Sequence, residues 1–336
     1  MIVTSTFAQL RREVLSDPNE KKFDVIVTEL EAYYKDRDKG RGSGYNQFRR
    51  WETLHGDRLS PDGKLTNYAA RNYAAFKKLK VYTQSNTRAT NGYWSFQGPT
   101  DYILGSGWNG GNGRVNCISI HPSNSNIIYV GTPAGGLWRS TNGGSTWSPR
   151  TDGIPSLGVS GVAINPNATN TIYILTGDGD GTQTNSIGVL KTTNGGTTWK
   201  ETGLSWGDES EVRGYKLLMH PNDPDILFVA SSVGIIKTTD GGASWDTVVT
   251  ANITDIEFKP GNPTIMYAAS KRFYKSITSG DTWTQPATGD LPATGFSRIA
   301  IGVSPDIPIM CTCSLEEEKQ GSKDYIAHSV PVIILI

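Results

Sequence analysis

The sequence predicts an all-β protein, a β-propeller of four-stranded blades that follows a small helical N-terminal extension. One short signature occurs four times, at residues 140–147, 192–199, 238–245 and 276–283. The Trp that closes each copy lies 52, 46 and then 38 residues after the previous one, which is the length of one four-stranded unit with its loops. Each unit also repeats short β-rich runs broken by Gly, Asn, Asp and Pro. Such regular spacing favours a propeller with one unit per blade.

Each predicted blade begins with an inner strand that ends at a residue–Pro pair. Pro cannot donate to a β-ladder, so it belongs just past a strand end. A polar turn, a second strand and a third strand that enters the signature follow, and a fourth strand begins at the signature Trp. The inner strands are expected at 115–120, 159–164, 215–219 and 253–258, the second strands at 127–131, 171–176, 226–230 and 265–269, and the third strands at 136–139, 188–191, 234–237 and 273–275.

The signature residues suit a tight hairpin. The Asn or Asp side chain is short and can bond backbone amides in the turn, and the Gly residues after it tolerate the positive φ that such a hairpin requires. The Trp buries its ring against neighbouring strands. The fourth copy has Thr278 in place of the acid or amide, which predicts a looser turn. The residues that we interpret as structural are Asn142, Trp147, Asn194, Trp199, Asp240, Trp245 and Trp283.

The region before the repeats has helical periodicity. Apolar side chains from Phe23 to Tyr34 follow the i, i+3, i+4, i+7 spacing of one helix face, and the glycines at 40–44 end that helix. A second helix is expected at 67–80. We interpret residues 10–80 as an extension docked on the propeller. The alternative is a basic aromatic patch at 45–51 that binds a partner or a polymer.

The other domain boundaries follow from composition. Residues 1–9 look like the remnant of a signal peptide and predict a secreted or cell-surface protein. Residues 81–93 form a linker rich in Thr, Asn and Ser, and residues 94–305 form a partial propeller of four complete blades plus the start of a fifth. The tail at 306–336 breaks the pattern, which indicates a frameshift or early stop in a larger protein. A genuine small protein that closes its ring by dimerising is the alternative. In both cases the partial propeller has an open edge, which predicts self-association.

Composition excludes several classes of function. The formal net charge is +0, with a surplus of basic residues in the first 80 positions and of acidic residues afterwards, and no basic stripe that would suit nucleic acid. Cys117 is expected in the core, and Cys311 and Cys313 lack the second pair or nearby His of a zinc site. No apolar stretch reaches the ~20 residues of a membrane span. His121 and His220 precede Pro at equivalent positions and are interpreted as turn caps.

Three loops carry the candidate binding residues. The loop at 176–182 places two carboxylates at i and i+2, where they could share Ca²⁺ or line the mouth of the propeller. The glycine-rich loop at 108–114 could present a Trp to a sugar ring or serve as an entry turn. The loop at 206–213 has three carboxylates, and their separation would decide any glycosidase geometry. The candidate binding residues are Trp108, Arg114, Asp178, Asp180, Trp206, Asp208, Glu211 and Arg213, with Asp178 and Asp180 as the calcium candidates.

The four signatures resemble Asp-box (BNR) repeats, which occur in sialidases, two-propeller xyloglucanases and sortilin-type propellers. The resemblance implies that the boxes are structural and lie on outer hairpins. The segments 110–115, 121–122 and 129–136 are similar to the xyloglucanases. In that family a catalytic Asp follows the Thr of a Thr-Asp-x-Gly-Gly segment in the first blade. Pro133 holds that position here and cannot act as an acid or a base.

The segments 35–37 and 48–51 resemble the leader region of large secreted propeller proteins of Bacteroidetes-type bacteria. The expected function is therefore a secreted or cell-surface binding or scaffold module for a glycan or a surface protein. The alternative is a glycoside hydrolase, xyloglucanase-like or sialidase-like, with catalytic residues partly missing from this chain. The sialidase reading needs an arginine cluster and a Tyr nucleophile paired with Glu, and the sequence supports it weakly.

Overall fold

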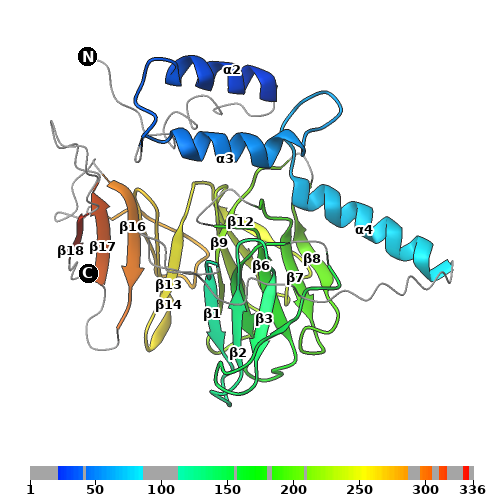
Figure 1. Ribbon diagram of the computed structural model, residues 1–336. Helices are drawn as coiled ribbons and strands as arrows, with labels where there is room; N and C mark the ends of the chain where they lie inside the picture. Colours follow the sequence, from blue (N-terminus) through cyan, green and yellow to red (C-terminus); the bar gives the residue numbers. More distant parts are fainter. Residues whose placement is uncertain are drawn as a thin grey trace.

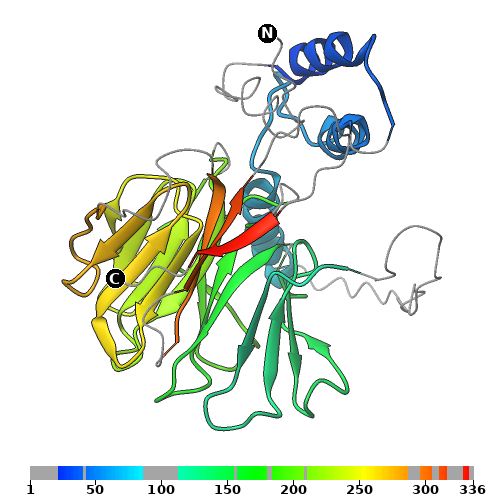
Figure 2. The same ribbon diagram turned by 90° about the vertical axis from the view of Figure 1, so that its left-hand side faces the viewer.

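The computed structural model describes residues 22–40, 43–85, 113–154, 157–179, 184–207, 210–286, 296–304, 310–315 and 328–332. Within these ranges, five antiparallel sheets stand side by side and three helices lie toward one end of them (Figures 1 and 2). In every sheet each strand pairs with the next strand along the chain. The predicted all-β propeller with a helical extension is confirmed. We number the sheets blade 1 to blade 5 in chain order.

The strands match the predicted repeat closely. Blade 1 comprises β1 (Cys117–Ile120), β2 (Ile128–Gly131), β3 (Leu137–Ser140) and β4 (Ser148–Pro149). Blade 2 comprises β5 (Val159–Ile164), β6 (Ile172–Thr176), β7 (Gly188–Thr192) and β8 (Lys200–Ser205). Blade 3 comprises β9 (Gly214–Met219), β10 (Leu227–Ser231), β11 (Ile235–Thr238) and β12 (Asp246–Val249). Blade 4 comprises β13 (Asp255–Lys259), β14 (Asn262–Ala269) and β15 (Phe273–Ser276), and blade 5 comprises β16 (Phe296–Gly302), β17 (Met310–Leu315) and β18 (His328–Val332).

Two blades depart from the expected pattern. In blade 4 the segment after the fourth box makes an isolated bridge between Lys275 and Thr284, and no fourth strand forms in the described part of the chain. In blade 5 the residues that break the sequence pattern still form strands, because β17 pairs with β16 on one side and with β18 on the other.

The hydrophobic core lies between the blades. Tyr129 and Leu137 of blade 1 pack against Ile172 and Ile174 of blade 2, and all four side chains are buried. Equivalent clusters join blade 2 to blade 3 and blade 3 to blade 4. Burying one such side chain contributes roughly 1.5–3 kcal/mol. The blades are therefore held face to face by apolar contact.

The boxes are closed by hydrogen bonds to two side chains. In blade 2 the Thr192 hydroxyl accepts from the amides of Asn194 (3.2 Å) and Gly196 (3.1 Å), and Asn194 Oδ1 accepts from the Thr198 amide at 2.9 Å. The boxes of blades 1 and 3 repeat this pattern. The structural interpretation of these side chains thus has a specific basis in the hairpin.

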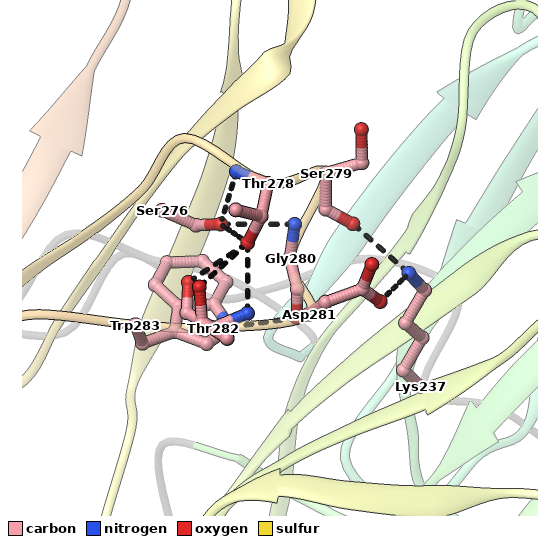
Figure 3. A network of polar contacts seen from close by, with 8 residues as sticks. All are labelled: Lys237, Ser276, Thr278, Ser279, Gly280, Asp281, Thr282 and Trp283. Atoms are coloured by element: carbon pink, nitrogen blue, oxygen red, sulfur yellow. Dashed lines mark hydrogen bonds and ion pairs between the residues drawn. The ribbon is translucent and has the colours of Figure 1, made fainter.

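The fourth box keeps the same network (Figure 3). Thr278 Oγ1 accepts from the Thr282 amide at 2.9 Å, and Ser276 Oγ accepts from the Gly280 amide at 3.0 Å. The prediction of a looser turn is wrong, because a threonine hydroxyl supplies the acceptor that Asn or Asp supplies elsewhere. Backbone strain arises one residue later. Ser279 has a positive φ of 54°, at a position where the other boxes have a Gly with positive φ.

The predicted burial of the box Trp rings is wrong for Trp147. Its side chain is 40% exposed, whereas Trp199, Trp245 and Trp283 are less exposed and pack against core clusters. Trp199 donates its indole N–H to the carbonyl of Arg150 in the preceding blade at 2.8 Å. Blade 1 has no preceding blade in the described part of the chain, so its Trp lacks such a neighbour.

The helices form a small core of their own. Residues Phe23–Tyr34 form α2 and residues Tyr45–Gly56 form α3, a helix that the sequence analysis did not predict. Ile26, Leu30 and Phe48 are buried between them. Trp51 is also buried, at 5% exposed. Two rings of the alternative basic aromatic patch, Phe48 and Trp51, are therefore buried in this core and do not face a partner.

Helix α4 (Tyr68–Ser85) connects the helices to blade 2. The side chain of Asn67 caps its first turn by accepting from the Ala70 amide at 3.1 Å. The same side chain donates to the Ser186 carbonyl at 3.0 Å and is fully buried. Lys77 forms a 2.6 Å ion pair with Glu201 on β8. None of the helices in the described ranges is long and apolar enough to cross a membrane.

Candidate functional site

The candidate loops and the boxes lie at opposite ends of the blades. In an antiparallel meander, the approach to the first strand and the loop between the second and third strands share one end. Arg114, the loop at 132–136 and the described residues 177–179 and 184–187 have these positions, so they share that end. The boxes follow the third strands and lie at the other end, as do His121 and His220. Each His caps its turn as predicted, accepting an amide through Nδ1 from Ser123 (3.3 Å) or Asp223 (3.1 Å).

Arg114 and Asp178 come together at this end although 64 positions separate them. Nη2 of Arg114 donates to Oδ1 of Asp178, and Asn116 Nδ2 donates to the same oxygen at 3.4 Å. The Asp178 side chain is fully buried, whereas the Arg114 side chain is 42% exposed. A buried carboxylate therefore anchors a guanidinium that still reaches solvent.

Two oxygen atoms in this cluster have acceptor capacity to spare. Asp178 Oδ2 and Asn116 Oδ1 are buried and receive no hydrogen bond within the described residues. Buried acceptors without a donor cost about 1–3 kcal/mol each. The cluster thus presents the partly exposed guanidinium of Arg114 to solvent, whereas these two acceptors are buried.

The backbone around the pair is closely fitted. The Asp178 amide donates to the Thr184 carbonyl at 2.8 Å, and the Thr184 hydroxyl donates to the Pro133 carbonyl at 2.7 Å. A Cβ on Gly158 would approach the Pro133 carbonyl oxygen to 2.3 Å and the Thr184 hydroxyl to 2.2 Å, so only glycine fits. Pro133 therefore belongs to the same end as the Arg114–Asp178 pair and takes part only through its backbone.

Two of the remaining candidates, Trp206 and Arg213, contact other groups of blades 2 and 3. The Trp206 amide donates to the Ile187 carbonyl at 3.2 Å, and its ring packs partly buried against the core between blades 2 and 3. The Arg213 amide donates to the Ser232 hydroxyl at 3.0 Å, and Glu211 is partly buried nearby in sequence. Trp108, Asp180 and Asp208 lie outside the described residues.

The calcium hypothesis gains no support from the described residues. They contain no group of three or more His, Cys, Asp or Glu side chains arranged for a metal ion. One oxygen of Asp178 is already engaged by Arg114, and the partner carboxylate Asp180 is outside the described ranges. Cys117, the thiol expected in the core, contacts the Val159 carbonyl, and burial raises its pKa to about 12.

A second charged cluster, which the sequence analysis missed, lies on the inner strands. Nζ of Lys216 on β9 donates to Asp255 (2.8 Å) and to Glu257 on β13, and Asp255 Oδ2 accepts the Ile301 amide of β16 at 2.7 Å. Burial raises the pKa of Glu257 above its ordinary value, although Lys216 opposes the shift. Burial lowers the pKa of Lys216, but the two carboxylates outweigh it and the net direction is upward. Carboxylates two apart in an inner strand were the only sequence signal.

Fold and repeats together define an Asp-box β-propeller, and the chain is similar to sortilin-type and xyloglucanase propellers. A family model described as sortilin, neurotensin receptor 3 matches residues 135–274. A xyloglucanase from Paenibacillus sp is 31% identical over 132 residues, which is 35% of this chain and 12% of that protein. The xyloglucanase Xgh74A of Acetivibrio thermocellus is 29% identical over 132 residues, 36% of this chain and 16% of that protein.

The structural comparison agrees with the sequence matches. The crystal structure of an ancestral GH74 enzyme superposes with a TM-score of 0.50 at 21% sequence identity and covers 61% of this chain and 30% of its own. At that identity the likeness supports the fold alone. The chain spans less than a third of this structure and less than a fifth of the two curated relatives.

Proposed function

We propose that this chain is an exported glycan-binding propeller module and that its ligand contacts the end of the blades that carries Arg114 and Asp178. The observation that carries the proposal is the partly exposed guanidinium of Arg114 held by the fully buried Asp178 carboxylate. Sugar hydroxyl groups accept hydrogen bonds, so they match the exposed donors of the Arg114 guanidinium, which Asp178 holds in place.

The ligand class follows from the relatives. Two matched proteins are named xyloglucanases, and the match covers 12% of one and 16% of the other. We therefore choose xyloglucan, a neutral β-glucan, as the first ligand to test. Export agrees with a polysaccharide ligand, since such polymers lie outside the cell.

Binding without cleavage is favoured by the residues beside the pair. Pro133, which stands where the resemblance to xyloglucanases places a catalytic Asp, contributes a carbonyl to Thr184 and has no ionisable group. Asp178 is engaged by Arg114 and is fully buried. Glycoside hydrolysis requires two carboxyl groups that flank the scissile bond. The Asp178 carboxylate, which is buried and held by Arg114, is poorly placed to be one of these two groups.

The test is retention of the purified full chain in native gels that contain xyloglucan, with an unrelated α-glucan as the control polymer. Arg114→Ala and Asp178→Asn are expected to weaken binding by about tenfold or more, because each removes a charge-assisted contact. Arg49→Ala is the matched control, since Arg49 is 47% exposed and lies on α3 in its own ion pairs. Equal retention of all variants, or none for the unmodified chain, contradicts the proposal.

Glycoside hydrolysis is the second candidate, and the names of the relatives favour it. Release of reducing ends from xyloglucan by the full chain, measured alongside the binding assay, would establish it. Binding with no release at any enzyme concentration supports the module function instead.

A further inference from the structure

The carboxamide of Asn67 joins the helical extension to two loops of blade 2. Its nitrogen donates to the Ser186 carbonyl at 3.0 Å and to the Gly207 carbonyl at 3.4 Å. Its oxygen accepts from the Ala70 amide at 3.1 Å and so caps the first turn of α4. Asn67 is fully buried. The side chain therefore uses its donors and its acceptor at once, on two different parts of the molecule.

Ser186 depends on this contact for one of its hydrogen bonds. It is fully buried, and its carbonyl receives no hydrogen bond from the described residues other than the one from Asn67. A buried carbonyl that loses its donor is unfavourable. The Ser186 hydroxyl lies 3.1 Å from the Thr176 hydroxyl and accepts from the Gly188 amide at 3.1 Å. Ser186 is therefore held by the ends of β6 and β7 on one side and by the extension on the other.

The backbone that carries Asp178 packs against Ser186. Gly177 has a φ of 101°, and a Cβ on it would approach the Ser186 amide nitrogen to 2.9 Å. The Asp178 amide donates to the Thr184 carbonyl at 2.8 Å. We call the described residues 176–179 and 184–188 the Asp178 loop. A shift of Ser186 reaches Asp178 through these contacts, and Asp178 in turn holds Arg114.

We propose that Asn67 is a positioning residue for the candidate site. Its carboxamide holds the Asp178 loop, and through it the guanidinium of Arg114, in the arrangement that meets the ligand. The link to a ligand rests on the glycan-binding function proposed above, whereas the hold on the loop is a property of the free protein. The extension is then a working part of the binding module, because α4 gives the loop a support that the blades do not supply.

The capping and holding roles of Asn67 can be separated by substitution. Ser caps a helix about as well as Asn, so Asn67→Ser keeps an acceptor for the Ala70 amide. Its single hydroxyl on a shorter side chain cannot replace the donors to Ser186 and Gly207. Asn67→Asp has the shape of Asn and also caps, but its ionised form has no donor. Two variants of different volume thus test the same lost donors, and either one can decide if the other does not fold.

Hydrogen exchange of the free full chain tests the hold on the loop. In both variants the amides of Asp178 and Gly188 are expected to exchange about tenfold faster, because the loop opens more often. Lys77→Met is the matched control and should leave both rates unchanged. Lys77 lies on the same helix, and its ion pair with Glu201 on the same blade is a solvent-exposed contact away from the Asp178 loop. Circular dichroism verifies that each variant is folded. Unchanged exchange at Asp178 overturns the proposal, whatever the ligand does.

Retention in gels that contain xyloglucan tests the consequence for the site. Asn67→Ser is expected to weaken binding by about tenfold, and Lys77→Met to leave it unchanged. If Asn67 acts through Arg114, adding Asn67→Ser to Arg114→Ala causes little further loss, whereas general destabilisation would add in full. Full additivity overturns the proposal, and so does an Asn67→Ser variant that exchanges faster but binds normally. If the unmodified chain does not bind xyloglucan, the proposed function fails, and the exchange rates alone decide whether Asn67 holds the loop.

Discussion

The ammonium nitrogen of Lys237, in the third strand of blade 3, lies 2.6 Å from the carboxylate of Asp281 in the box of blade 4 (Figure 3). It also donates to the Ser279 carbonyl at 3.0 Å. Lys191 of blade 2 makes the equivalent bond to the Gly241 carbonyl of blade 3, again at 3.0 Å. The boxes of blades 3 and 4 thus each receive a lysine from the preceding blade, which joins adjacent blades at the end opposite the candidate site.

Removing this lysine should destabilise the contact between blades. Lys237→Met keeps an unbranched side chain but removes the ammonium group, which lies over the Phe228 ring and bonds Ser279 and Asp281. The expected loss is about 1.5–3 kcal/mol of unfolding free energy, measured by urea denaturation. Lys271→Met, at an exposed position, is the control and should change little. An unchanged midpoint for Lys237→Met would contradict a stabilising role.

The positive φ of Ser279 predicts a stabilising substitution. Ser279→Gly relieves a conformation that costs a non-glycine residue roughly 1 kcal/mol, and we expect the thermal midpoint to rise. The reciprocal change, Gly241→Ser, imposes the same conformation on the third box and should lower the midpoint. The thermal midpoint must rise for Ser279→Gly and fall for Gly241→Ser. A fall for both variants would show that the Ser279 side chain contributes more than its backbone costs.

Acid should weaken the third box more than the first two. Hydrogen bonds from the Ser244 hydroxyl and amide, and from the Thr238 hydroxyl, hold the pKa of Asp240 below its ordinary value. A carboxyl whose pKa is lowered on folding stabilises the fold fully above its unfolded pKa, and this contribution is lost as the pH falls through the folded pKa.

The variant Asp240→Asn reproduces the residue found at Asn142 and Asn194 and removes that titration. Unfolding midpoints are measured from pH 7 down to the lowest pH at which both proteins fold. As the pH falls, the midpoint should therefore decrease less steeply for Asp240→Asn than for the unmodified chain. Parallel curves for the two proteins would mean that Asp240 contributes no proton-linked stability.

The inner-strand cluster predicts a partial rescue. Lys216→Met leaves Asp255 and Glu257 together without their cation and should cost about 2–3 kcal/mol. Adding Glu257→Gln removes one of the two carboxylates, so the double variant should recover part of that loss. Thermal unfolding of the two single variants and the double variant forms the cycle that measures it. Strictly additive losses would indicate that the three side chains do not interact.

The repeat made most of the propeller predictable. Each box carries its own hairpin chemistry in a few adjacent residues, and each inner strand ends at a Pro, so local sequence is sufficient for both. Helix α3 was missed for a local reason as well. Gly44, interpreted as part of the segment that ends the first helix, is the N-cap of α3 in the left-handed region at a φ of 84°.

The site was less predictable because it depends on packing between blades. The sequence placed Arg114 and Asp178 in two separate loops and gave no sign that they touch, since the contact follows from how blades 1 and 2 stack. The exposure of Trp147 has the same origin, because its environment is set by the neighbour of blade 1 and not by its own box. The Lys216 cluster likewise joins three successive inner strands.

The direction of the lysine contacts has a consequence for synthesis on the ribosome. Lys191 and Lys237 belong to the earlier blade of each pair, and the carbonyl that they bind belongs to the later one. Because the chain emerges from its N-terminus, the donor of each contact is in place before its acceptor leaves the exit tunnel. Each nascent blade therefore meets a preceding blade whose lysine has already been synthesised, which favours docking of these blades in chain order.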